Sequence, residues 1–172
     1  MPEANYNLGL ISKLKAESKG KPGNRTFRLL VNSPLGAALI WIEKEQLLEL
    51  SLHLKRTVGL IEVGENTVEP PPETLNLEEV IVEFKVSRQA IEFDEDAQLF
   101  RFWNHESEDT DEVATLIFEA TVTQVEQFAN QSLEVCSAGR PICQLCHQPK
   151  DPDGHFCSRS NGHPVNATER LQ

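Results

Sequence analysis

The chain has 172 residues, of which 39% are hydrophobic and 25% charged, and 27 acidic residues against 16 basic ones give a net charge of −11. This composition is typical of a globular protein with its own core, and no apolar run reaches the roughly 18 residues that a membrane-spanning helix needs. An acidic surface repels phosphate backbones, which argues against nucleic-acid binding. The first residues lack the basic and then apolar pattern of a secretory signal, so we expect a cytoplasmic protein.

The apolar pattern predicts two similar series of elements, each with three strands followed by a helix. In the first series we expect strands at residues 8–14, 26–31 and 38–42 and a helix at 43–61. In the second series we expect strands at 80–86, 97–103 and 114–119 and a helix at 123–137. The spacing of Thr123 and Glu126 is typical of a capping box at the start of that helix.

The recurrence suggests an internal duplication, with halves at about 1–62 and 77–138 joined by a linker at 63–76. In this alignment residues 39–41 correspond to residues 116–118. We therefore predict an α+β fold in which duplicated βββα units form a mostly antiparallel sheet with two helices on one face. This body spans residues 1–140, and residues 141–172 form a small C-terminal zinc knuckle.

The metal-site prediction rests on residues 143–163, which contain three of the four cysteines and three of the five histidines. The thiolates of Cys143 and Cys146 can bind one ion from a tight turn, and Cys157 supplies a third ligand. His155 can face the same ion because alternate residues of an extended segment point the same way, whereas a turn at Asn161-Gly162 can bring His163 there instead. His147 is a weaker third choice for the fourth ligand. Four protein ligands leave no position for water, so we expect a structural Zn²⁺.

No phosphate-binding, serine-nucleophile or zinc-protease motif occurs in the body, and we assign no catalytic residue. Lys21 and Arg25 lie in a basic stretch that either contacts an anion or forms only a hairpin turn. An enzyme acting on a phosphorylated small molecule would need a concave pocket that gathers cationic side chains with a carboxylate or an imidazole. The candidates for such a pocket are Arg25, Arg28, Arg101 and His105.

Four stretches carry a resemblance to a known family: GKPGNRTFRLLV, EKEQLLELSLHL, EFKVSRQAIEFDED and AGRPICQLCHQPKDPDGHFCSRSNGH. Over nearly its full length the chain resembles the bacterial domain-of-unknown-function 3090 family, which is common in actinobacteria. It departs from the family's C-terminal signature at Ile142, His147 and Ser158, where the signature has Pro, Gly and Pro. The resemblance favours His155 as the fourth zinc ligand, because family members often have an aromatic residue at the position of His163.

The resemblance implies no established activity. Family genes tend to lie beside those of a phosphatase/phosphomutase-like protein and a kinase-like protein, which suggests a protein partner. Our leading hypothesis is a cytoplasmic, non-enzymatic protein-binding or adaptor module with a structural zinc ion. The alternative is an enzyme or ligand-binding protein for a phosphorylated small molecule, and nucleic-acid recognition through the zinc tail ranks third.

Overall fold

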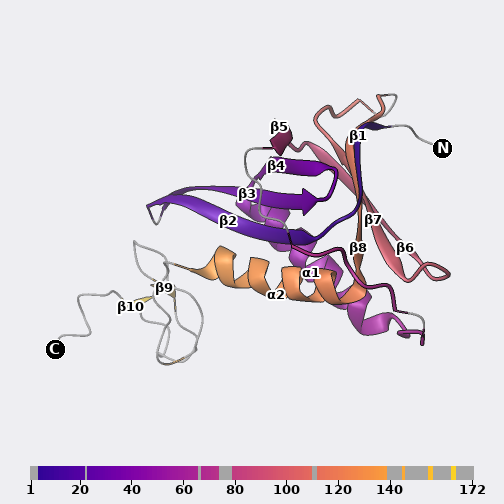
Figure 1. Ribbon diagram of the computed structural model, residues 1–172. Helices are drawn as coiled ribbons and strands as arrows, with labels where there is room; N and C mark the ends of the chain where they lie inside the picture. The colour runs from indigo at the N-terminus through magenta and orange to yellow at the C-terminus, as the bar shows by residue number, and fades with distance from the viewer. Residues whose placement is uncertain are drawn as a thin grey trace. The chain divides into compact units, whose positions relative to one another are not determined.

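The computed structural model describes residues 4–21, 23–65, 67–73, 79–109, 112–138, 145, 155–156 and 164–165. In this part of the chain the fold is α+β, with two four-stranded mixed sheets and two helices (Figure 1). None of the described helices is long and apolar enough to span a membrane. The chain divides into two compact units, Met1–Lys19 with Thr26–Cys136 and Gly20–Arg25 with Ser137–Gln172.

One sheet has the strand order β1-β8-β7-β6. Its antiparallel meander consists of β6 (Arg88–Asp94), β7 (Leu99–His105) and β8 (Ala114–Thr121). The fourth strand, β1 (Ala4–Leu10), pairs in parallel with β8. Strand β6 is therefore one edge of this sheet.

The other sheet has the order β2-β3-β4-β5 and the same design. Its meander consists of β2 (Lys13–Lys21), β3 (Asn24–Ser33) and β4 (Gly36–Ile42). The fourth strand, β5 (Val80–Lys85), pairs in parallel with β4. Here the edge strand β2 has the position that β6 has in the first sheet.

Each meander is followed by a helix, α1 (Lys44–Leu60) after β4 and α2 (Val122–Ser137) after β8. The strand that precedes each meander joins the sheet of the other half: β1 precedes β2 but pairs with β8, and β5 precedes β6 but pairs with β4. The unit that recurs along the chain is therefore ββββα, with its first strand exchanged between the two sheets.

The prediction of one mostly antiparallel sheet is wrong, because the strands divide between two mixed sheets. Apolar alternation indicates that a strand is half-buried, but it does not indicate which strand pairs with which. The expected strand at 8–14 is broken at residues 11–12 into β1 and β2, and β6 was not predicted. Both predicted helices are confirmed, with small shifts at their ends.

The start of α2 also differs from the prediction. Thr121 Oγ1 accepts a hydrogen bond from the Gln124 backbone N–H at 3.1 Å, and Gln124 Oε1 accepts one from the Thr121 N–H at 2.9 Å. The capping box is therefore formed by Thr121 and Gln124, two residues before the predicted pair Thr123 and Glu126.

A single apolar core joins both sheets and both helices. It includes Leu8 from β1, Phe84 from β5, Leu47 from α1 and Phe128 from α2. Because each sheet contains a strand from the other half, the two halves cannot separate without breaking parallel strand pairs. The core thus positions each helix beside an edge strand.

Candidate functional site: the groove between α1 and β6

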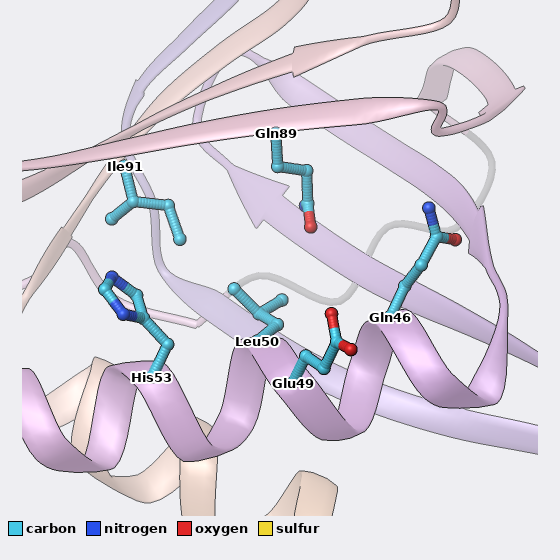
Figure 2. A pocket seen from close by; sticks show the side chains of 6 residues that line it. All are labelled: Gln46, Glu49, Leu50, His53, Gln89 and Ile91. Atoms are coloured by element: carbon cyan, nitrogen blue, oxygen red, sulfur yellow. The ribbon is translucent and has the colours of Figure 1, made fainter.

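A groove of about 300 Å³ lies between α1 and the edge strand β6. Six side chains line it, four from α1 and two from β6: Gln46, Glu49, Leu50, His53, Gln89 and Ile91. The helical residues recur every three or four positions and so share one helix face. Figure 2 shows that the side chains of both elements point into the space between them.

The backbone N–H and C=O groups of Ile91 point outward from the edge of the sheet, on the side of β6 opposite β7. The Ile11 N–H donates to the Glu119 carbonyl at 2.9 Å, which places the backbone groups of Glu119 on the β1 side of β8. Glu119 of β8 is paired with Arg101 of β7, and Arg101 is in turn paired with Glu92 of β6. Since backbone groups alternate between the two sides of a strand, those of Glu92 face β7 and those of Ile91 face outward.

A second groove, between α2 and β2, is equivalent to the first. The Val86 N–H donates to Trp41 O as the Ile11 N–H donates to Glu119 O, both at 2.9 Å. Ile11 therefore corresponds to Val86, and five residues further on Ala16 corresponds to Ile91. The predicted alignment of residues 39–41 with 116–118 is wrong by one residue, because the hydrogen bonds match Trp41 to Glu119.

The helices align in the same way. Gln46 accepts a hydrogen bond from the Glu43 N–H at 3.0 Å, and Gln124 accepts one from the Thr121 N–H at 2.9 Å. Seven residues further along the helices, His53 of α1 corresponds to Gln131 of α2. The α2–β2 groove, of about 230 Å³, is lined by Gln131 among others.

The two grooves differ at the strand edge. The Gln131 carboxamide accepts a hydrogen bond from the Ala16 N–H at 2.8 Å and donates one to the Ala16 carbonyl at 2.6 Å. At the equivalent position His53 is exposed, and no described residue bonds to the outward N–H or C=O of Ile91. The β2 edge is closed by its own helix, and within the described chain the β6 edge is open.

The α2–β2 groove is further covered by the connection between α1 and β5. Glu73 of this connection lines the groove and forms a 3.2 Å ion pair with Lys13. Among the described residues, no connecting segment contributes to the α1–β6 groove, whose lining comes from α1 and β6 alone.

Two of the arginines considered for an anion site are engaged in ion pairs with carboxylates of the protein. Arg28 pairs with Glu17 at 2.9 Å and lies over Trp41, and Arg101 pairs with Glu119 at 2.8 Å. Lys21, at the end of β2, is exposed, and Arg25, near the start of β3, is half-buried. Neither of these two residues lines the α1–β6 or the α2–β2 groove.

His105 is the other titratable group singled out from the sequence. It is buried, and burial together with the nearby Arg88 guanidinium lowers the pKa of its imidazole below the usual 6.5. Arg88 Nη2 lies 3.2 Å from His105 Nδ1. This pair joins two neighbouring strands of the sheet and is not part of the α1–β6 groove.

The predicted zinc ligands lie almost entirely outside the described residues. Cys143, Cys146, Cys157 and His163 are not described, and for His155 only the backbone is, in the short strand β9 (His155–Phe156). Val165 of β10 (Pro164–Val165) pairs with His155. The metal site remains a prediction from the sequence.

The fold and this groove define an α+β domain in which, within the described residues, the β2 edge is bonded by its helix and the equivalent β6 edge is open. A protein-family comparison matches residues 6–157 to the family described as "Protein of unknown function (DUF3090)", and the chain belongs to this family. The comparisons with curated proteins and with solved structures gave no match.

Proposed function

We propose that this protein is a cytoplasmic protein-binding module that accepts an extended peptide segment of its partner along the outer edge of β6. The observation that carries the proposal is the contrast between the two strand edges. Gln131 supplies Ala16 with an acceptor and a donor, whereas Ile91 presents the same two backbone groups beside a groove. An added strand supplies both partners, as in β-strand addition.

Two further features support this site. Proteins commonly protect edge strands by covering them, and here only one of two equivalent edges has a cover among the described residues. The groove next to the β6 edge gives alternate side chains of an added strand a place to pack, with Leu50 and Ile91 as its apolar surface. Backbone pairing would supply affinity, and the groove would supply specificity.

The zinc ion belongs to this proposal as a structural element of the C-terminal tail, with Cys143, Cys146, Cys157 and His155 as ligands and His163 as the alternative. Its role would be to fold a segment too short to form its own apolar core. We propose no catalytic step.

The test uses short random peptides displayed on phage and selected on the full-length protein. The key variant is Ile91→Pro, which removes an outward N–H but no bond of the β6–β7 ladder. Ile91→Val, which keeps the N–H and a β-branched side chain, is the matched control. We expect selected peptides to bind wild type and Ile91→Val but not Ile91→Pro.

Thermal melting of both variants verifies that each is folded. Failure to select any peptide, or equal binding to Ile91→Pro and Ile91→Val, would contradict the proposed function.

A further inference from the structure

We infer that the peptide segment bound at β6 carries a lysine or arginine whose cationic group enters the groove and pairs with Glu49. This inference rests on the proposed function and specifies the chemistry of the partner. It follows from the hydrogen-bonding groups of Glu49 and Gln89, which face the groove from opposite walls.

The Gln46 carboxamide forms two hydrogen bonds within the protein. Its Oε1 accepts from the Glu43 N–H at 3.0 Å, and its Nε2 donates to the Ser87 carbonyl at 3.4 Å. Both ends of this carboxamide are therefore used in fixing the start of α1 against the residue that precedes β6.

Gln89 presents an acceptor. Its Nε2 donates to Asn104 Oδ1 at 2.7 Å, and this bond fixes the orientation of the amide. Figure 2 shows the oxygen of Gln89 pointing from β6 toward the helix, on the side where Glu49 lies. A primary amide whose nitrogen is already engaged offers mainly its oxygen to a ligand.

Among the described residues, Glu49 is the only carboxylate that lines the groove, and no described lysine or arginine lines it. Its side chain is exposed, and none of the described basic residues forms an ion pair with it. The Glu49 carboxylate and the Gln89 oxygen thus face the same space from opposite walls (Figure 2). An ammonium or guanidinium group, which has several donors and no acceptor, complements this pair.

The equivalent groove lacks this pair of acceptors. Counting along the aligned elements places Gln127 at the position of Glu49 and Leu14 at that of Gln89, and both residues line the α2–β2 groove. The covered groove thus has a neutral amide and an apolar side chain where the open groove has a carboxylate and an amide oxygen. At these aligned positions the acceptor pair therefore lies in the groove beside the open β6 edge, whereas the Glu73 carboxylate of the covered groove is paired with Lys13.

The geometry of strand addition directs the cation to this place. Side chains of an added strand alternate between the two faces of the sheet, so every second one points the same way as Gln89 and Ile91. Those two side chains point into the groove. A long basic side chain beside them reaches Glu49 while its methylene groups lie against Leu50. The net charge of −11 also favours the approach of a basic segment.

The experiment uses fluorescently labelled peptides of alternating valine and threonine that differ only at a central residue: lysine, glutamine or glutamate. Binding to the full-length protein is followed by anisotropy at low and high salt. We expect the lysine peptide to bind about tenfold more tightly than the glutamine peptide, and the glutamate peptide to bind weakest. The preference for lysine should decrease with salt.

The variants Glu49→Gln and Gln89→Leu install the residues of the covered groove. Both should reduce the lysine preference, measured as the ratio of the dissociation constants of the glutamine and lysine peptides. As a control, Glu45→Gln removes an exposed carboxylate from the first turn of the same helix, where it does not line the groove, and should keep the preference.

The possible failures are distinguishable. Peptides that bind in an Ile91-dependent way but without a lysine preference overturn this inference and leave the proposed function intact. A lysine preference that survives Glu49→Gln overturns it too. Absence of binding by all three peptides and by the phage library overturns both proposals. Both proposals are also overturned if sedimentation equilibrium shows a dimer that Ile91→Pro abolishes. A second copy of the chain would then occupy the β6 edge.

Discussion

Gln131 binds both backbone groups of Ala16, with its oxygen 2.8 Å from the Ala16 nitrogen and its nitrogen 2.6 Å from the Ala16 oxygen. One side chain therefore replaces one residue of a neighbouring strand. At the equivalent position of the other half, His53 stands opposite Ile91 and lacks a carboxamide. For the hydrogen bonds of the strand edge itself, the difference between the closed and the open edge is therefore one residue on each helix.

The closed edge should contribute to stability. Ala16 is buried, and Gln131→Ala removes the partners of its N–H and C=O, so we expect the free energy of unfolding to fall by about 1–3 kcal/mol. The matched control is His53→Ala at the equivalent exposed position, which should change it by less than about 0.5 kcal/mol. Urea denaturation followed by circular dichroism measures both. Equal losses in the two variants would show that Gln131 does not support the β2 edge.

Replacing His53 by glutamine should close the open edge. The new carboxamide can bond to the N–H and C=O of Ile91 as Gln131 bonds to those of Ala16. We expect His53→Gln to raise the free energy of unfolding by up to about 1 kcal/mol and to weaken binding of the lysine peptide at least tenfold. His53→Asn, whose side chain is too short to reach, is the control. Unchanged peptide binding by His53→Gln would mean that the peptide does not use Ile91.

Stability should decrease in mild acid because of His105. Its pKa is lowered from 6.5 by burial and by Arg88, so the unfolded chain takes up a proton at a higher pH than the folded protein. This group leaves the free energy of unfolding unchanged well above pH 6.5. As the pH falls from 6.5 toward the pKa that His105 has in the folded protein, His105 lowers the free energy of unfolding. Below that folded-state pKa its effect is constant.

The Ser12 N–H donates to Asn32 O as the Ser87 N–H donates to His105 O, so Asn32 of β3 is equivalent to His105. The variant for this test is therefore His105→Asn. Its free energy of unfolding should decline less than that of the wild type over the same pH range. Urea titrations at a series of pH values compare the two. Parallel pH profiles would contradict the assignment.

The predicted zinc site should be occupied in protein purified without chelators. Elemental analysis should give about one zinc per chain, and Cys143→Ser should lower it. His155→Ala should reduce zinc more than His163→Ala does, and the opposite order would make His163 the fourth ligand. Chelation should leave the thermal melt of the body, residues 1–140, cooperative. Collapse of the whole protein on chelation would contradict a purely local role for the metal.

Much of the fold could be predicted from periodicity. The runs around Leu39 and Ile117 are apolar enough to indicate interior strands, and the wide apolar stripe of α1 indicated a helix. The exchange of β1 and β5 between sheets could not be predicted, because strand pairing depends on contacts between residues far apart in the chain.

The groove between α1 and β6 could not be predicted from the sequence for a related reason. Strand β6 has Ile91 and Phe93 in alternation with Glu92 and Asp94, a signal that was present but short and weak. His53 is an ordinary helical histidine when it is considered on its own, and nothing in the sequence around it indicates a functional role. Only the alignment of the two halves in space shows that His53 stands where Gln131 closes the other edge.

The most direct test of the open edge is amide hydrogen exchange at Ile91 and Ala16, measured by NMR on the full-length protein with and without the lysine peptide. We predict slow exchange at Ala16 in both samples. At Ile91 we predict fast exchange in the protein alone and slow exchange once the peptide is bound. An Ile91 amide that is already protected in the protein alone, or one whose exchange the bound peptide does not change, would contradict the account.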